Sequence, residues 1–328
     1  MRASFLLSRI AALALAAVVG SASAAQDYPN HPVTLVVPYL PGGATDQVAR
    51  ALSQALTDKW KQPVVIVNRP GASGIIGSSE VIRAKPDGYT LLLSDNSTFV
   101  TVPHMLATVP FNVQRDFTPV TIVARQAAVL TVRNGFPAAN VKELIEYARA
   151  HPGAVTFGSF GNGTWAHVAM EEMSRLANIE MLHVPFRGGA QVLTEMMAGR
   201  VDIFFATMGA VAPYSESGKL KVLATATADR LPSQPGLPTM SEDGLPGYSL
   251  SLWFGLVAPA QTPPAIVDRI RKDIAELNTD PAFQKALERL SLERGGETPQ
   301  EFAKMLNEES ERWRRVIEER GLKEQAGN

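Results

Sequence analysis

The fold is decided by the stretch Thr34-Leu-Val-Val-Pro-Tyr-Leu-Pro-Gly-Gly-Ala-Thr-Asp46, which runs from a strand through a loop towards a helix. Residues 34–37 form a short apolar run, which is typical of a buried parallel strand. Pro38 and Pro41 cannot extend a central strand, because proline has no N–H for the ladder. Gly42 and Gly43 allow backbone angles that other residues avoid, and they leave room for a ligand.

A helix follows this loop, since Val48, Ala51, Leu52, Ala55 and Leu56 recur on one face. Free N–H groups at its start attract anions through hydrogen bonds and through the helix dipole. The alternative is an ordinary strand-to-helix turn, because glycine is common there as well. This stretch alone leaves both interpretations open.

The N-terminal residues 1–24 are predicted to be a secretory signal peptide. Arg2 and Arg9 provide the positive start, residues 10–19 are apolar, and residues 22–24 fit a cleavage motif. The apolar run is too short for a membrane span, which needs roughly 20 residues. We expect cleavage after residue 24 or 25 and a periplasmic mature chain, long enough at 328 residues for two domains.

Composition excludes several function classes. Cysteine is absent, which removes thiolate nucleophiles, iron–sulfur clusters and thiolate metal sites. The formal net charge is −1 and there is no basic run, so we expect no nucleic-acid partner. No paired histidine motif is present, and we expect neither a metal nor a cofactor.

Strands and helices alternate after the opening stretch. Residues 62–71 contain an apolar strand that ends in a turn, and residues 89–93 form a third strand after a helix. This order predicts right-handed βαβ units and a parallel sheet, and therefore an α/β fold. Polar residues 94–98 follow the third strand at its carboxyl end, where open α/β sheets bind ligands.

The pattern of strand, glycine-rich loop and helix recurs at residues 158–167. Residues 117–133 are long enough to leave one domain and enter another, and residues 251–259 are the natural strand for the return. Helices are expected at residues 264–278, 281–290 and 299–320. An apolar stripe on the last helix fits either a partner surface or packing on the core, and we favour the core. It consists of Phe302, Met305, Leu306, Trp313, Val316 and Ile317.

Short motifs span nearly the whole mature chain. They lie at residues 37–46, 67–71, 86–90, 116–119, 158–167, 184–188, 199–202, 238–244, 253–255 and 258–260. In order and spacing they resemble those of the Bug-type extracytoplasmic receptors of tripartite tricarboxylate transporters. Tyr39 departs from the family, which often has Phe there, and Thr207 lies where members differ.

The resemblance implies a type II periplasmic binding protein fold, with two α/β lobes joined by two crossing strands and a ligand cleft between them. We expect lobe 1 to comprise residues 25–124 and 251–328, and lobe 2 residues 125–250. The resemblance also implies a receptor rather than an enzyme, which delivers a small carboxylate to the membrane components of the transporter. We expect it to act as a monomer.

The two glycine loops predict the geometry of the site. Each lies at a helix start, so a carboxylate held between them would meet two positive dipole ends. The expected ligand-binding residues are Tyr39, Gly42, Gly43, Ala44, Thr45, Ser94, Asn96, Ser159, Gly161, Asn162, Gly163, Thr164, Arg187 and Thr207.

Five side chains near these loops allow two interpretations each. Asp46 would repel an anion, so we expect it to satisfy N–H groups of its own loop. His167 is expected to brace the second loop, because a lone histidine is more often structural. Arg187 fits either a second carboxylate or a surface salt bridge. Tyr39 and Trp165 could wall the pocket, and we favour this for Tyr39 and core packing for Trp165.

Two other functions compete with transport. An exported hydrolase of carboxylate esters would need a nucleophile, and Ser159 with His167 is the one suggestive Ser/His pair. The sequence lacks the Gly-x-Ser-x-Gly and His-Glu-x-x-His motifs, which argues against it. A receptor that presents its ligand to a membrane sensor would share the same fold. The sequence leaves the identity of the carboxylate open.

Overall fold

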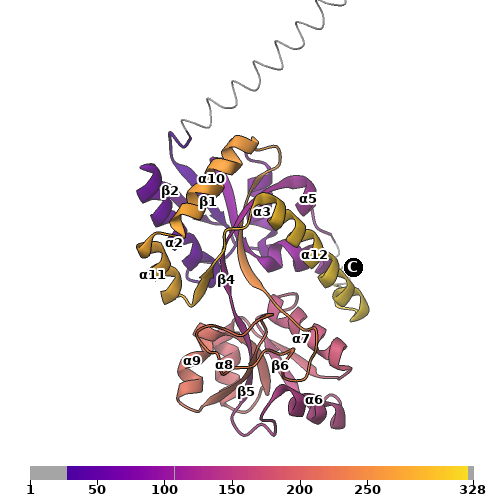
Figure 1. The fold of residues 1–328 in the computed structure, drawn as a ribbon. Helices are drawn as coiled ribbons and strands as arrows, with labels where there is room; N and C mark the ends of the chain where they lie inside the picture. Colours follow the sequence, from indigo (N-terminus) through magenta and orange to yellow (C-terminus); the bar gives the residue numbers. More distant parts are fainter. Residues whose placement is uncertain (1–27, 107, 324–328) are drawn as a thin grey trace, which may run out of the picture.

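A computed structural model of the chain describes residues 28–106 and 108–323, which form two lobes with one β-sheet each (Figure 1). The predicted signal peptide lies outside these residues. Lobe 1 has a six-stranded sheet in the order β11-β4-β10-β3-β1-β2. Its strands are β1 (Val33–Val37), β2 (Val64–Asn68), β3 (Thr90–Asp95), β4 (Phe117–Gln126), β10 (Leu252–Pro259) and β11 (Leu292–Arg294).

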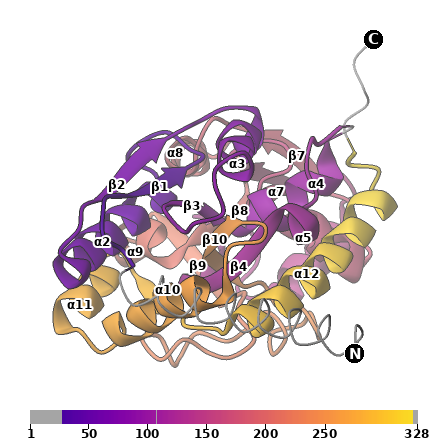
Figure 2. The same cartoon turned by 90° about the horizontal axis from the view of Figure 1, so that it is seen from above.

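The sheet of lobe 1 is mixed. β1 pairs in parallel with β2 and β3, as the βαβ pattern predicts, whereas β10 lies antiparallel between β3 and β4. One face of the sheet is covered by three helices that lie together in Figure 2. They are α2 (Ala44–Trp60), α10 (Pro264–Leu277) and α11 (Pro281–Arg289).

The other face of this sheet carries α12 (Pro299–Glu319) and several short helices. Five of the six residues of the apolar stripe of α12 are buried and Met305 is half-buried, as core packing predicts; Trp313, for example, is 3% exposed. The short helices are η1 (Ala72–Gly74), α3 (Ile75–Ile82), η2 (Ser97–Thr101), α4 (Val102–Met105) and α5 (Val113–Asp116).

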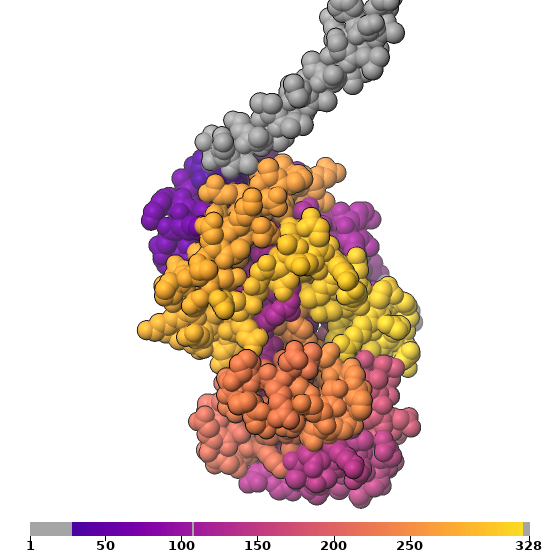
Figure 3. Space-filling view, in the orientation of Figure 1, coloured from indigo at the N-terminus to yellow at the C-terminus, as the bar shows by residue number. Residues whose placement is uncertain are grey.

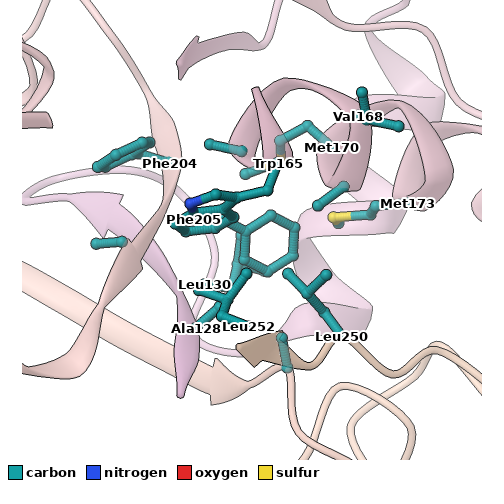
Figure 4. Close-up of a cluster of buried hydrophobic side chains, with 14 of the residues drawn as sticks. Ala128, Leu130, Trp165, Val168, Met170, Met173, Phe204, Phe205, Leu250 and Leu252 are labelled. Carbon is teal, nitrogen blue, oxygen red and sulfur yellow. The ribbon is translucent and has the colours of Figure 1, made fainter. Parts of the chain in front are cut away.

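Lobe 2 has a five-stranded sheet in the order β7-β6-β8-β5-β9. Figure 4 shows its core, where Trp165, Met170 and Met173 of α7 meet side chains of β5 and β8. The strands are β5 (Ala128–Arg133), β6 (Thr156–Ser159), β7 (Leu182–Pro185), β8 (Ile203–Thr207) and β9 (Leu220–Thr225). The helices are α6 (Val141–Ala150), α7 (Trp165–Ala177), α8 (Gly189–Met197) and α9 (Met208–Glu216).

The chain crosses between the lobes at two adjacent places. β4 ends at Gln126 and β5 begins at Ala128, and the return segment enters β10 at Leu252. Gln126 and Leu252 are paired across the β4–β10 ladder, so the two crossings lie side by side.

The C-terminal helix α12 makes a third connection between the lobes. Three ion pairs join its end to α7 of lobe 2. In Figure 3 the yellow C-terminal segment accordingly reaches down to the lower lobe. The pairs are Arg320–Glu171 at 2.6 Å, Arg175–Glu319 at 3.3 Å and Arg312–Glu172 at 3.5 Å.

Within residues 28–106 and 108–323, no helix combines the length and the apolar character that crossing a membrane requires.

Candidate functional site

A cavity of about 710 Å³ lies between the lobes, a volume typical of small-molecule sites. Lobe 1 contributes the β1–α2 loop and the end of β3, and lobe 2 contributes the β6–α7 loop and the start of α8. Ten of the fourteen predicted residues line it: Tyr39, Gly43, Ala44, Thr45, Asn96, Asn162, Gly163, Thr164, Arg187 and Thr207.

The β1–α2 loop presents a row of unpaired donors. The helix begins at Ala44, so the N–H groups of Gly43, Ala44 and Thr45 precede the first intrahelical bond, which Gln47 N–H donates to Gly43. Within the part of the chain that the structure describes, these three N–H groups have no hydrogen-bond acceptor. Together with the helix dipole they form a local centre of positive potential on the cavity wall.

Gly42 was expected to bind the ligand, but its N–H donates to Asp46 Oδ2 at 2.9 Å and the residue is absent from the cavity lining. Gly42 has φ +91°, a backbone angle that favours glycine, and this conformation turns its N–H towards the start of α2. Its contribution is therefore to the shape of the loop.

Asp46 is fully buried and contacts its own loop rather than the cavity. Besides Gly42 N–H it accepts hydrogen bonds from Asn68 Nδ2 at 3.0 Å and from Arg50 Nε at 2.8 Å. Burial raises the pKa of this carboxyl, but the hydrogen bonds outweigh it and hold the pKa below the usual value. A charged carboxylate thus ties the loop to β2 and to α2.

The β6–α7 loop, in contrast, satisfies most of its own polar groups. Gly161 N–H donates to Ser159 Oγ at 3.1 Å, and Gly163 N–H donates to His167 Nδ1 at 3.1 Å. The Thr164 hydroxyl donates to the Gly161 carbonyl at 2.8 Å. Ser159 and Gly161 are absent from the cavity lining, so neither stands where a ligand would touch it.

Asn162 is the exposed tip of this loop and lines the cavity. Neither its backbone N–H nor its side-chain amide has a hydrogen-bond partner within the described parts of the chain. The N–H groups of Trp165 and Ala166, at the start of α7, are likewise unpaired there. Lobe 2 therefore offers donors from this tip and from the N–H of Trp165, because Trp165 lines the cavity and Ala166 does not.

Two histidines support the loop from behind. His183 Nε2 lies 2.6 Å from Ser159 Oγ, and the His183 ring stacks on His167 with 3.9 Å between ring centroids. Burial lowers the pKa of His183 to about 4, and burial together with His183 lowers that of His167 to about 3. Both rings are neutral at neutral pH. The serine therefore pairs with His183, not with the His167 suggested by the sequence.

Ser94 also lies behind the wall of the cavity. β3 extends to Asp95, two residues further than the apolar pattern predicts, so Ser94 is a fully buried strand residue. Its hydroxyl donates to Thr98 Oγ1 at 2.7 Å.

Three aromatic side chains form an apolar wall. The sequence indicated Trp165 as either a wall or a core residue, and it is both buried and part of the lining, whereas nothing in the sequence indicated Phe160 or Phe204. The Phe160 ring packs edge-on against Trp165, with centroids 5.2 Å apart, and against Phe204 at 6.1 Å. All three line the cavity, as does Leu40, which is 69% exposed. They come from separate elements, and only the tertiary fold brings them together.

Arg187 and Asp95 are the two charged side chains among the lining residues that the structure describes. Arg187 is exposed and forms no ion pair with any described residue. Asp95 accepts a hydrogen bond from the Tyr39 hydroxyl at 2.7 Å, and burial raises its pKa. No group of three potential metal-ligating side chains occurs among the described residues.

Comparison with known proteins assigns the chain to a family. The family model for the tripartite tricarboxylate transporter family receptor matches residues 48–322. The chain belongs to this receptor family. Protein BugT of Bordetella pertussis is 32% identical over 98% of this chain and 99% of its own length.

Solved structures of periplasmic receptors share the fold, which confirms the predicted two-lobed α/β architecture. The receptor chain resembles R. palustris Rpa4515, solved with adipate, with a TM-score of 0.79 and 34% identity over 89% of this chain and 98% of the other. It also resembles MatC from Rhodopseudomonas palustris, solved with bound malate, with a TM-score of 0.75 and 29% identity over 88% and 100%.

Proposed function

We propose that the mature protein captures a small carboxylate between its lobes in the periplasm and presents it to the membrane components of a tripartite tricarboxylate-type transporter. The proposal rests on one arrangement: unpaired N–H groups at Gly43, Ala44 and Thr45, and the free tip at Asn162, border a single cavity. A carboxylate there would be hydrogen-bonded from both lobes and would face two helix starts. Relatives that hold adipate and malate support this ligand class.

Arg187 supplies a position for a second carboxylate, since it is a cation on the lining with no acidic partner among residues 28–106 and 108–323. A thermal-shift screen of the mature protein against mono-, di- and tricarboxylates tests the function. A ligand at 100 times its Kd stabilises the fold by about 2.7 kcal/mol. The proposed function fails if no carboxylate shifts the melting temperature.

The role of Arg187 has its own test. Arg187→Gln should weaken binding of a dicarboxylate by about tenfold or more, because a charge-assisted pair is lost, and should leave a monocarboxylate nearly unaffected. Arg83→Gln, an exposed arginine outside the cavity lining, is the matched control. Equal losses for both ligand types would contradict a carboxylate role for this side chain.

We further propose that ligand binding closes the lobes and that the receptor acts as a monomer after cleavage at residue 24. A ligand that contacts both lobes favours the closed form through those contacts. Small-angle X-ray scattering should then give a smaller radius of gyration with ligand than without it. The molecular mass from the same data should be that of a monomer. An unchanged radius would contradict closure, and sequencing of the mature N-terminus checks the cleavage site.

The Ser/His geometry argues against the alternative function of an ester hydrolase. The Ser159–His183 pair resembles a nucleophile with its base, but Ser159 is fully buried, and no carboxylate among the described residues bonds His183. If the protein hydrolysed carboxylate esters and His183→Ala abolished this activity, the result would support the ester-hydrolase alternative. Presentation to a membrane sensor is distinguished from transport by measuring ligand uptake in cells that lack the receptor gene.

A further inference from the structure

The end of β3 contributes a polar corner to the cavity that the carboxylate-binding loops do not explain. Asp95 closes the strand and Asn96 follows it, and both residues line the cavity from lobe 1. They come from a different element than the N–H donors of the β1–α2 and β6–α7 loops, although Asp95 accepts a hydrogen bond from Tyr39 of the first loop.

Asn96 carries an unused hydrogen-bond donor. The residue is 1% exposed, and its Nδ2 has no partner among the residues that the structure describes. A buried donor left unpaired costs about 1–3 kcal/mol, so native structures seldom retain one without a reason. Asn96 is a lining residue whose amide nitrogen is buried just behind the cavity surface, so an acceptor on a ligand that fills the cavity would satisfy it.

Asp95 carries an unused acceptor. Its Oδ1 accepts hydrogen bonds from the Tyr39 hydroxyl at 2.7 Å and from the N–H groups of Ser97 at 3.1 Å and Thr98 at 3.5 Å. Its Oδ2 accepts none from any described residue. Three donors on one oxygen fix the orientation of the carboxyl group, and the other oxygen is left to meet a ligand.

The unused acceptor of Asp95 and the unused donor of Asn96 determine which functional group of a ligand can bind to both. An ammonium group only donates and would leave the Asn96 amide unpaired, whereas a carboxylate only accepts and would stand against the Asp95 charge. A hydroxyl both donates and accepts. We propose, building on the carboxylate-receptor function, that Asp95 Oδ2 and Asn96 Nδ2 bind a hydroxyl group, so that the receptor selects a hydroxycarboxylate.

Matched ligand pairs that differ by one hydroxyl test this selection. Isothermal titration of the mature protein would compare malate with succinate, 3-hydroxybutyrate with butyrate, and mandelate with phenylacetate. In at least one pair the hydroxylated member should bind about tenfold more tightly, because one charge-assisted and one neutral hydrogen bond are added. Aspartate and succinamate, which place an ammonium and a carboxamide on the same skeleton, should bind less tightly than malate.

The variant Asn96→Ala should remove most of the preference within the favoured pair, measured as the ratio of the two affinities, so that any loss of binding shared by both members cancels. Equal affinities within all three pairs of the wild-type protein would overturn the hydroxyl selection, as would tighter binding of aspartate or succinamate. Plain carboxylates that bind without a hydroxyl preference would leave the proposed function intact. If no carboxylate binds at all, both proposals fail.

Discussion

Replacing Asp46 with asparagine tests whether this buried carboxylate holds the β1–α2 loop together. The substitution keeps the shape of the side chain and removes its charge. Gly42 N–H donates to Oδ2 and Asn68 Nδ2 donates to Oδ1, so both oxygens act as acceptors in the native protein. The new amide has one oxygen and can serve only one of the two donors.

The expected cost follows from these contacts. One hydrogen bond to a charged group is lost, worth about 1.5–3 kcal/mol, and a buried donor then faces an NH₂ group, which costs about 1–3 kcal/mol. Arg50 adds at most about 0.5 kcal/mol, because its side chain is 60% exposed. We expect the free energy of unfolding to fall by about 3 kcal/mol.

Urea denaturation followed by tryptophan fluorescence measures this change. Asp58→Asn is the matched control, since Asp58 lies exposed on the same helix α2 and its carboxylate bonds only Gln54 among the described residues. It should alter stability by less than about 0.5 kcal/mol. A double-mutant cycle with Asn68→Ala should give a coupling energy of about 1 kcal/mol or more. A loss no larger than that of the control would refute the bracing role of Asp46.

Two further predictions concern the walls around the site. Gly158→Ala would place a Cβ 2.3 Å from Val192 Cγ1 and should lower the free energy of unfolding by about 1–3 kcal/mol. In the control Gly236→Ala the new Cβ would have no described atom within 4 Å, and equal melting temperatures of the two variants would contradict tight packing at Gly158. Burial raises the pKa of Glu309 from the usual 4.5 to about 7, despite the hydrogen bonds from Trp253 Nε1. Because the folded protein holds this proton more tightly than the unfolded chain, the free energy of unfolding should fall as the pH rises from 4.5 to about 7. Trp253 fluorescence should change with a midpoint near pH 7, and a midpoint that persists in Glu309→Gln would assign it to another group.

Local patterns in the sequence predicted the elements that depend on local chemistry. The Pro-Gly-Gly loop falls between β1 and α2 as expected, and the last three helices end within one residue of their predicted positions. Proline starts each of those helices, and a fixed φ at the first turn is a signal that the sequence itself carries.

Contacts between distant residues could not be predicted in this way. His183 lies 24 residues beyond Ser159, and its Nε2 is within hydrogen-bond distance of the Ser159 hydroxyl, a pairing that no local sequence pattern predicts. The aromatic wall joins Phe160 and Phe204 from different strands and loops. The predicted carboxylate donors of the second loop are largely occupied for the same reason, because the loop folds back on its own carbonyls and on His167.

The ion pairs between α12 and α7 have a consequence for the salt dependence of the receptor. Lobe 2 is joined to lobe 1 at two adjacent strand crossings, and it could rotate about them. The ion pairs between α12 and α7 lie away from that axis and oppose the rotation. Any relative movement of the lobes must therefore shift the pairs of Glu171 and Glu172 with their arginines. The arginines are 29% exposed but the carboxylates only 5% and 9%, so mobile ions screen these pairs in part, and we expect ionic strength to have a small effect on how readily the proposed closure occurs.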